Sequence, residues 1–379
     1  MKICITTDIL NNFIWTGINY YIYYLLKNLL KIDEENEYKF FYLQGIKDKY
    51  PQYFLDNKNV EHIVFRYPQL LRKIFMYSSI YFNLPTIENF VKDIDVYHSV
   101  NNFSFPCKDS KLIFTVYDLT PILFPKYHKD NVVKLSKHFN KFFHSSNKII
   151  SISESTKNDL INYLNIPEDK IKVIYLAAEE GFYQIKDKEK IKPVLDYYGI
   201  TKPYILYVGT LEPRKNIENL LRAYFKLSKN IKDEYLLVLA GTKGWKYEPI
   251  FKLIKELTLE SNIIITDYVK HNDLPLLING ASLFVYISFY EGFGLPVLEA
   301  MACGIPVITS NTSSLPEITG DAGILVDPKN VEEISFSIQN VLENSYIQKE
   351  LSIKGIKQSK KFSWEKTALL TLETYKSLY

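Results

Sequence analysis

The chain has 379 residues, of which 47% are hydrophobic and 23% are charged, and its formal net charge is +3. Such a composition is typical of a folded globular protein with about two domains. It excludes a disordered chain, and the near-neutral charge is not that of a nucleic-acid-binding protein. The three cysteines are far apart and show neither CxxC nor histidine spacing, so we expect no disulfide framework and no metal cage.

The relation of the chain to membranes is predicted from its apolar windows. The opening residues, MKICITTDIL, pass directly into a strand and a polar turn, which is not the pattern of a signal peptide. No window of about 18 uncharged apolar residues occurs, so we expect no spanning helix. We therefore expect a cytoplasmic protein, with any membrane contact peripheral and on the inner face.

The first half of the chain alternates short apolar runs with amphipathic stretches, the pattern of a parallel sheet covered by helices on both faces. One such helix is predicted over 17–33, GINYYIYYLLKNLLKID. The predicted strands are 2–8, 39–44, 61–66, 96–100, 112–118, 148–153 and 172–177.

The second half repeats this alternation after 179–193, whose charge and lack of pattern indicate a linker. The fold class predicted is α/β, with two facing, Rossmann-like, doubly wound domains, a deep cleft between them and ligands at the carboxyl ends of the strands. The expected domains are 1–180 and 195–362, and a last helix over 363–379, with Ser363 as its N-cap, completes the first. The predicted strands of the second half are 204–209, 235–241, 262–268, 282–288, 306–310 and 322–327.

The stretch SFYEGFGLPVLEAMACGIPVITS, residues 288–310, places two glutamates on either side of a helix start. Pro296 near the first turn and Gly304 after the last are ordinary start and stop signals for a short helix. Glu291 then lies in the loop after a buried strand, and Glu299 about one turn inside the helix. No cation stands near them in the sequence, so a partner must come from elsewhere.

A ligand that carries both phosphates and hydroxyls would fit this stretch. Gly292 and Gly294 let backbone amides come close to a ligand, and a helix N-terminus attracts phosphate. A carboxylate repels phosphate but accepts hydrogen bonds from a sugar diol. We therefore predict a nucleotide sugar as the ligand of Glu291 and Glu299. The alternative for Glu299, a solvated position on a surface helix, is disfavoured by its small and apolar neighbours.

A basic pair occurs in GTLEPRKN, residues 209–216, after a strand and a turn and before a helix. Arg214 and Lys215 are therefore expected at the ligand edge of the second domain. A nucleoside diphosphate gains about two negative charges as it leaves, so fixed cations stabilise the transition state more than the ground state. A surface helix cap is the alternative role for this pair.

Together these stretches resemble the motifs of the retaining glycosyltransferases of family 4, the group 1 glycosyltransferases, which have the two-domain GT-B fold. Glu291 and Glu299 match the E-x7-E motif of that family. The resemblance covers nearly the whole chain. The sequences of the motifs are most similar to those of bacterial mannosyltransferases. The other matching stretches are ISESTKNDLINYLNIPEDKIKVIYLAAEEGFY (152–183), YILYVGTLEPRKNIENLLRAY (204–224), SNTSSLPEITGDAGILVDP (310–328) and FSWEKTALLTLETYK.

The resemblance implies a role for each residue on the donor side. Glu299 would hold the ribose hydroxyls and Glu291 those of the donor sugar, while Arg214 and Lys215 would grip the diphosphate. Gly17, in TGIN, matches a glycine turn near the donor phosphate, although it could be a plain turn glycine. Thr210 stands where some relatives have a basic residue. The full set expected to bind the donor is Gly17, Gly209, Thr210, Arg214, Lys215, Glu291, Gly292, Phe293, Gly294, Leu295 and Glu299.

The acceptor side is expected in the first domain. VYDLTPILFPKYH (116–128) resembles the family's HD element, whose histidine commonly meets the donor sugar, but here that position is Tyr117. A phenol is no base near pH 7, so Asp118 is our candidate for orienting the acceptor hydroxyl, with capping as the alternative. His98, at another strand end, is either an acceptor contact or a structural histidine. The expected catalytic set is Glu291, Lys215, Arg214 and Asp118.

The resemblance also implies the chemistry. Members of the family retain the anomeric configuration, with the leaving phosphate oxygen deprotonating the acceptor on the same face of the sugar, so no protein nucleophile is required. Neither a metal nor another cofactor is expected. The triplet DID, 93–95, resembles the metal-binding DxD of another glycosyltransferase fold, but it precedes a strand, away from the ligand edge, and is predicted to be a turn.

The predicted reaction moves a hexose, of mannose or glucose type, from a nucleotide sugar to a saccharide or lipid-linked saccharide in the assembly of a cell-surface polysaccharide such as lipopolysaccharide. The motifs favour GDP-mannose, with UDP-glucose and UDP-N-acetylglucosamine as alternatives. Two other functions stay open: a nucleotide-sugar 2-epimerase-like isomerase and a non-catalytic sugar-nucleotide-binding partner. A dinucleotide oxidoreductase is disfavoured because no G-x-G-x-x-G follows a strand.

Two segments are candidates for membrane contact. Residues 101–150 hold eight lysines against three aspartates, which fits either a solvated helix face or contact with an anionic bilayer. The passage 64–82, VFRYPQLLRKIFMYSSIYF, could meet a lipid-linked acceptor or the bilayer, or pack as a plain helix on the sheet. No partner other than donor, acceptor and membrane is expected, and nothing in the sequence indicates the oligomeric state.

Overall fold

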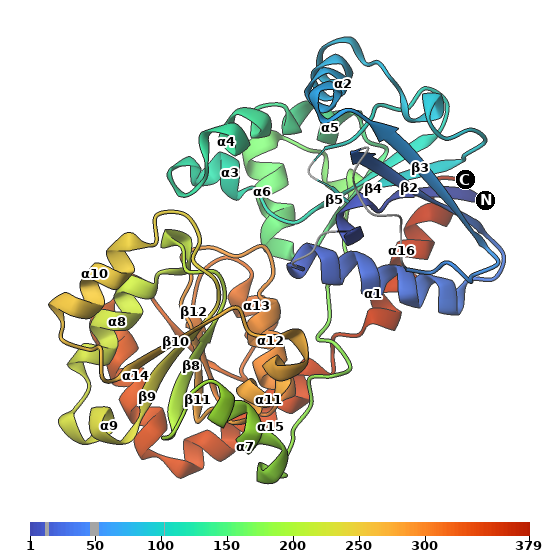
Figure 1. Cartoon of the computed structure of the whole chain (residues 1–379). Helices are drawn as coiled ribbons and strands as arrows, with labels where there is room; N and C mark the ends of the chain where they lie inside the picture. Colours follow the sequence, from blue (N-terminus) through green and yellow to red (C-terminus); the bar gives the residue numbers. More distant parts are fainter. Residues whose placement is uncertain (12–14, 46–52, 102) are drawn as a thin grey trace. The chain divides into compact units, whose positions relative to one another are not determined.

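The computed structural model describes residues 1–11, 15–45, 53–101 and 103–379, which divide into two compact units. The first unit comprises Met1–Leu176 and Trp364–Tyr379, and the second comprises Ala177–Ser363. Each unit has a parallel sheet between helices, so the prediction of two Rossmann-like α/β domains is confirmed (Figure 1). Across these described ranges, no helix is long and apolar enough to cross a bilayer.

The first unit contains a seven-stranded sheet with the order β3-β2-β1-β4-β5-β6-β7. Each strand lies within a few residues of its predicted position. The order reverses between β1 and β4, where the carboxyl ends of neighbouring strands open a place for a ligand. The strands are β1 (Lys2–Thr6), β2 (Glu37–Gly45), β3 (Val60–Tyr67), β4 (Val96–Ser99), β5 (Lys111–Val116), β6 (Lys148–Ser151) and β7 (Ile171–Val173).

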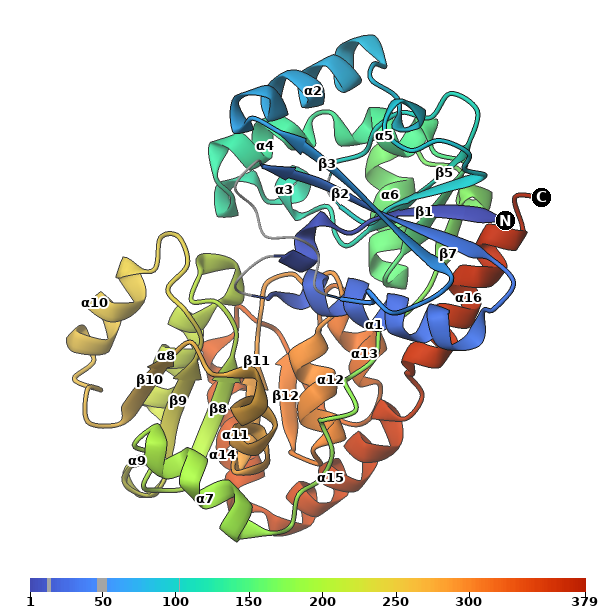
Figure 2. The same cartoon turned by 45° about the vertical axis from the view of Figure 1, so that its right-hand side comes forward.

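The last helix of the chain packs in the first unit, beside α1, as both views show (Figures 1 and 2). The ring of Trp364 stacks on that of Tyr24, with centroids 5.4 Å apart, and the Thr367 hydroxyl donates to the Tyr175 carbonyl at 2.7 Å. The helices are α1 (Gly17–Ile32), α2 (Gln69–Phe82), α3 (Thr120–Leu123), α4 (Asp130–Ser136), α5 (Phe139–Ser145), α6 (Glu154–Leu164) and α16 (Trp364–Lys376), with 3-10 turns η1 (Asp8–Asn11), η2 (Ile87–Asn89), η3 (Pro125–Tyr127) and η4 (Glu168–Lys170).

The triplet 93–95 is a bend before β4, as predicted. Asp93 has a φ of 57° and pairs with Lys2, and the Asp95 carboxylate accepts the backbone N–H of Lys2 at 2.7 Å. These two aspartates therefore connect β1 to the segment just before β4.

The second unit contains a six-stranded sheet with the order β10-β9-β8-β11-β12-β13. Its strands again match the predicted runs, and the order reverses between β8 and β11. The strands are β8 (Tyr204–Val208), β9 (Leu236–Ala240), β10 (Ile263–Asp267), β11 (Leu283–Tyr286), β12 (Val307–Ser310) and β13 (Ile324–Val326). The helices are α7 (Lys188–Tyr197), α8 (Ile217–Lys226), α9 (Lys229–Glu234), α10 (Glu248–Glu256), α11 (Leu274–Asn279), α12 (Leu295–Ala302), α13 (Leu315–Thr319), α14 (Val331–Glu343) and α15 (Ser345–Ser359), with 3-10 turns η5 (Pro213–Lys215) and η6 (His271–Asp273).

The predicted linker is part of the second unit, which corrects the expected start of that domain at 195. Helix α7 begins inside the segment and buries Ile191 and Val194, an apolar pair at helical spacing among many charged residues. The Asn279 side chain accepts the N–H of Ile185 at 2.7 Å and donates to the Tyr183 carbonyl at 3.0 Å. The many charged residues of the segment led to its prediction as a linker, although it packs in the second unit.

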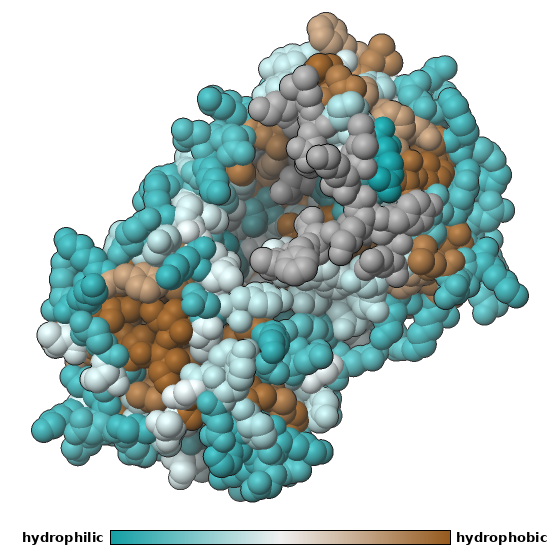
Figure 3. All heavy atoms as spheres, viewed as in Figure 1, coloured by the Kyte–Doolittle hydropathy of each residue, from teal (hydrophilic) through white to brown (hydrophobic). Residues whose placement is uncertain are grey.

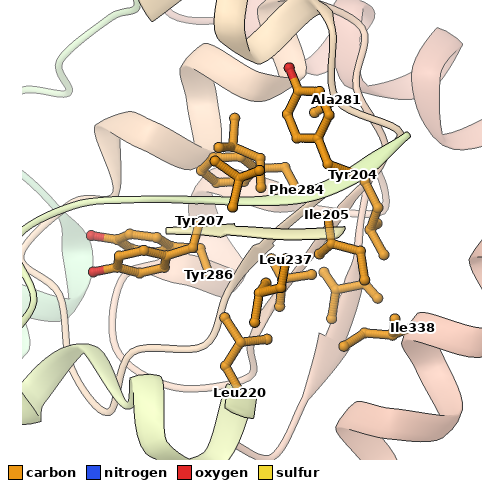
Figure 4. Close-up of a cluster of buried hydrophobic side chains, with 14 of the residues drawn as sticks. Tyr204, Ile205, Tyr207, Leu220, Leu237, Ala281, Phe284, Tyr286 and Ile338 are labelled. Carbon is orange, nitrogen blue, oxygen red and sulfur yellow. The ribbon is translucent and has the colours of Figure 1, made fainter. Parts of the chain in front are cut away.

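The core of the second unit extends to the carboxyl ends of its central strands. Tyr207 of β8 and Tyr286 of β11 are almost fully buried, and their rings lie parallel with centroids 5.8 Å apart. Figure 4 shows that both hydroxyls point the same way, out of the apolar cluster. The hydroxyl groups of these two core tyrosines therefore lie at the carboxyl edge of the second sheet, where a ligand is expected.

Candidate active site

Two loops that are far apart in the sequence meet at the carboxyl edge of the second sheet. One follows β8 and contains GTLEPRKN, and the other follows β11 and contains EGFG. Because β8 and β11 are neighbours in the sheet, the two loops lie side by side. The Phe289 N–H donates to the Arg214 carbonyl at 3.0 Å, which joins the loops directly.

Four charged side chains of these loops form a buried cluster. The Glu291 carboxylate contacts Arg214 Nη1 at 2.9 Å and Lys215 Nζ at 2.7 Å, and Arg214 Nη2 contacts Glu212 at 2.9 Å. The sequence shows no cation near Glu291. The fold supplies two, Arg214 and Lys215, from the other loop. Burial alone would raise the pKa of Glu291, but the charges of Arg214 and Lys215 outweigh it and lower that pKa to about 2.

The floor of this cluster is the hydroxyl of Tyr286. It accepts a hydrogen bond from Lys215 Nζ at 2.7 Å and donates to Glu291 at 3.1 Å. Burial, and then the neighbouring charge of Arg214, lower the pKa of Lys215. Sequence reasoning missed Tyr286 and Glu212, since a tyrosine within a strand and an acid before a proline carry no distinctive pattern.

Polar side chains hold the backbones of both loops. The Asn216 amide donates to the carbonyls of Ile287 and Pro328, and Asn216 itself has a left-handed φ of 59°, which asparagine tolerates well. The Ser314 hydroxyl hydrogen-bonds within the glutamate loop, at 3.0 Å from the Glu291 carbonyl, and the Glu291 N–H donates to Ser313 at 3.0 Å. The serines of SNTSS thus position Glu291, a role that its motif match did not reveal.

Glu299 lies on α12, one turn from its start, as predicted, and is 8% exposed. Within the described part of the chain its carboxylate accepts no hydrogen bond, unlike that of Glu291. Burial and the nearby charge of Glu179 raise the pKa of Glu299 to about 8. Glu179 itself contacts His271 Nε2 at 2.9 Å. Glu299 therefore has its acceptor oxygens available for hydroxyl donors of a ligand.

The start of α12 presents backbone amides. Gly294 has a φ of 115°, and a Cβ there would lie 2.8 Å from Leu315 Cδ2, so only glycine fits. The N–H groups of Gly294 and Leu295 donate to no acceptor in the residues that the structure describes. Gly292 is buried, and the Phe293 ring packs against Phe362. Donor contacts at 292–295 would therefore come from the backbone.

A glycine pair lies at the ends of β8 and β9. The Gly209 N–H donates to the Ala240 carbonyl at 2.9 Å, and a Cβ on Gly241 would lie 2.0 Å from the Gly209 carbonyl oxygen. Thr210 is partly exposed, and its carbonyl accepts a hydrogen bond from Tyr207 at 3.2 Å. Gly241 was not among the predicted site residues, although its place after a strand and next to Gly209 supports the same loop.

The first unit places its predicted residues at the carboxyl ends of its strands or just beyond. Gly17 is the first residue of α1 and is exposed. The Tyr117 hydroxyl donates to the Val100 carbonyl at 2.8 Å, and burial raises its pKa. Asp118 is partly exposed and accepts hydrogen bonds from the N–H and hydroxyl of Thr120, the first residue of α3, at 2.9 and 2.6 Å. The donor and acceptor roles of these residues stay predictions.

His98 is a core residue, so of its two predicted roles the structural one is confirmed and the acceptor contact is wrong. The side chain is 0% exposed, with Nδ1 at 2.7 Å from the Tyr375 hydroxyl and Nε2 at 2.8 Å from the Thr115 hydroxyl. Burial lowers its pKa to about 3, so the ring stays neutral. It ties β4 to β5 and to α16.

Comparison with known proteins places the chain in a family. Residues 15–179 match the family described as Glycosyltransferase Family 4, and residues 188–361 match Glycosyl transferases group 1. The O-antigen chain mannosyltransferase B of Escherichia coli is 35% identical over 388 aligned residues, which cover 100% of each chain. The chain therefore belongs to the family 4, or group 1, glycosyltransferases and is an enzyme of that class. This membership decides against the epimerase-like alternative.

Solved structures agree on the fold. A sucrose-phosphate synthase from Thermosynechococcus elongatus has a TM-score of 0.76 at 18% identity, covering 100% of this chain and 98% of its own. Anabaena Alr3699/HepE, in complex with UDP and glucose, has a TM-score of 0.74 at 17% identity, with 100% of each chain covered. At these identities the likeness concerns the fold, which is the expected GT-B class.

Proposed function

We propose that this glycosyltransferase moves a hexose from a nucleoside diphosphate sugar to a saccharide acceptor, free or lipid-linked, during assembly of a cell-surface polysaccharide. The observation that carries the proposal is the buried Glu291–Arg214–Lys215 cluster, together with the buried carboxyl of Glu299 one turn inside the helix that follows the glutamate loop. The name of the Escherichia coli relative, aligned over both whole chains, favours mannose and therefore GDP-mannose.

Each part of the donor has a matching group in the second unit. The ribose diol fits the Glu299 carboxylate, and the diphosphate fits Arg214, Lys215 and the free amides of Gly294 and Leu295. The hydroxyls of the hexose fit Glu291. The second unit thus offers groups for a diol, a diphosphate and a sugar, which a nucleotide sugar carries in one molecule.

The proposed reaction is a same-face displacement with retention of configuration. The bond from the anomeric carbon to the phosphate oxygen breaks, and the acceptor oxygen bonds to that carbon from the same side. The acceptor proton passes to the leaving phosphate oxygen, so the protein supplies no nucleophile. Arg214 and Lys215 stabilise the negative charge that develops on the diphosphate, in a buried setting where such interactions are strong.

We propose that neither a metal nor another cofactor is needed, because two fixed cations already stand where a divalent ion would neutralise the diphosphate. The first unit would supply the acceptor site, with Tyr117 and Asp118 as its candidate residues, and Gly17 would lie near the donor phosphate. The protein would work in the cytoplasm, where nucleotide sugars are made.

Product analysis by NMR would test the reaction. The protein would be incubated with GDP-mannose, and in parallel with UDP-glucose or UDP-N-acetylglucosamine, together with short mannosides and EDTA. We expect a new α-linked mannoside from GDP-mannose, because the donor is α-configured and the configuration is retained. A β-linked product would refute retention, and activity that disappears with EDTA and returns with Mg²⁺ would refute metal independence.

Peripheral membrane contact has a candidate surface, the α2 patch, defined as Ile74, Tyr77, Tyr81, Phe82 and Leu84. These side chains are between 47% and 76% exposed, and Figure 3 shows apolar side chains on the surface where Figure 1 labels α2. Lys108, Lys111 and Lys141 line an adjacent hollow. Exposed aromatics beside lysines match the interface of an anionic bilayer, so we propose that this patch docks there.

Vesicle sedimentation would test the docking. We expect the protein to bind vesicles with phosphatidylglycerol more than vesicles of phosphatidylcholine alone, and the double variant Phe82→Ser, Leu84→Ser to lose that binding. The matched control is Phe336→Ser on α14, whose side chain is 73% exposed in the second unit. Equal binding by both variants and wild type would contradict the assignment.

A further inference from the structure

In the free protein, the positive and negative charges of the charged cluster in the second unit neutralise one another. It holds two cations, Arg214 and Lys215, and two carboxylates, Glu212 and Glu291, so its formal charge is zero. The four side chains are between 3% and 14% exposed. The cations that a diphosphate would need are therefore already paired.

The hydrogen bonds of Arg214 show why this pairing matters. Its Nη1 donates to the Tyr290 carbonyl at 2.7 Å and contacts Glu291 at 2.9 Å, which uses both hydrogens of that nitrogen. A phosphate oxygen can bind Nη1 only if Glu291 leaves. Lys215 has three donors, of which Tyr286 and Glu291 take two.

We propose that Glu291 is an internal anion that competes with the diphosphate for Arg214 and Lys215, and that the sugar of an intact donor draws it away. This inference rests on the proposed function. The hydroxyls of the hexose replace the lost N–H contacts of Glu291, while the phosphates take over the cations. A nucleoside diphosphate without sugar offers Glu291 no such replacement.

The exchange requires only a side-chain rotation. The backbone of Glu291 is fixed by Ser313 and Ser314 through hydrogen bonds at its N–H and its carbonyl. Arg214 keeps its place when Glu291 turns, because Nη2 stays bound to Glu212 and its own carbonyl stays bound to Phe289. Glu212 is thus a positioning residue, and Glu291 is the exchanging one.

The consequence is discrimination between substrate and product. Once the sugar has been transferred, Glu291 returns to the cations and weakens the hold on the nucleoside diphosphate. The site therefore favours the nucleotide sugar over the product, although the product carries more charge on its terminal phosphate. Without this exchange, a pair of fixed cations would hold the product more tightly than the donor.

Calorimetric titration of GDP and GDP-mannose into wild type, Glu291→Gln and Glu212→Gln would test the inference. Glutamine keeps the shape of the side chain and removes the charge. We expect Glu291→Gln to bind GDP at least about tenfold more tightly than wild type does, with a smaller gain or a loss for GDP-mannose. Glu212→Gln makes the same charge change but leaves Glu291 on the cations, so GDP affinity should not rise.

Equal tightening in both variants would mean that net charge alone matters, and would overturn the inference. So would unchanged or weaker GDP binding by a folded Glu291→Gln. Wild type supplies a check that needs no variant: it should bind GDP-mannose at least as tightly as GDP, and a clear preference for GDP would contradict the exchange. If wild type binds neither these ligands nor UDP and its sugars, the proposed function fails and the inference fails with it.

Discussion

The two glutamates of the E-x7-E motif are in opposite electrostatic states although both are buried. Glu291 faces two cations, which lower its pKa to about 2. Burial, and then the nearby charge of Glu179, raise the pKa of Glu299 to about 8. The protein holds Glu291 charged, whereas Glu299 in the free protein keeps its proton near neutral pH. We expect the hydroxyl donors of a ligand diol to stabilise the charged form of Glu299.

Glu299 should therefore cost the free protein stability at alkaline pH. Between its ordinary pKa of 4.5 and about 8, the folded chain keeps a proton that the unfolded chain has released. The free energy of unfolding then falls as pH rises through that range. We expect Glu299→Gln to be more stable than wild type by about 1–3 kcal/mol at pH 8.5, with a smaller difference at pH 5.5.

Urea unfolding at the two pH values would measure this difference. GDP-mannose titration would show whether the same variant has lost donor affinity, as the ribose role requires. A stability difference that does not depend on pH would contradict the raised pKa, and full donor affinity would refute the ribose role.

Lys215 should matter more to turnover than to binding. In the proposed reaction its charge acts on the diphosphate most strongly as the leaving group separates, so we expect Lys215→Ala to lower kcat by about 100-fold or more while donor affinity falls less. Lys229→Ala, at an exposed lysine where α9 begins, is the control. Steady-state kinetics with GDP-mannose would decide, and an unchanged kcat would remove Lys215 from the phosphate site.

At the scale of elements, the start of α12 depends on one glycine. Gly294 adopts a left-handed φ of 115°, and an added Cβ would meet Leu315 at 2.8 Å. We expect Gly294→Ala to lose about 1–3 kcal/mol of stability and to weaken donor binding, because the helix start would shift. Gly181→Ala is the matched control, since a Cβ there meets nothing within 4 Å. Thermal unfolding of the two variants gives the comparison, and equal melting temperatures would contradict it.

Local patterns were enough to predict the strands, because β-rich apolar runs and turn signals are properties of short segments. They did not predict that the β8 loop supplies the cations for Glu291, since that contact depends on the order of strands in the sheet. They also left the role of His98 open, because a histidine at a strand end has the same sequence pattern whether it faces a ligand or the core. The helix α7 was missed because two apolar residues lay among many charges.

At the scale of the whole molecule, all the charged side chains proposed to bind the donor belong to one unit. Glu212, Arg214, Lys215, Glu291 and Glu299 all belong to Ala177–Ser363, which has its own sheet and core. We expect that segment, expressed alone, to fold and to bind GDP, but to transfer no sugar because the first unit is missing. Circular dichroism and calorimetry would test this, and a folded segment without nucleotide binding would contradict the assignment of the donor site.

The most direct test of the account is donor turnover without an acceptor. Nucleoside diphosphate release would be measured from a panel of GDP- and UDP-sugars, in EDTA, with wild type and Glu299→Gln side by side. We expect slow release from GDP-mannose by wild type and a large loss of release in the variant. Equal release by both proteins, or neither release nor binding with any donor, would contradict it.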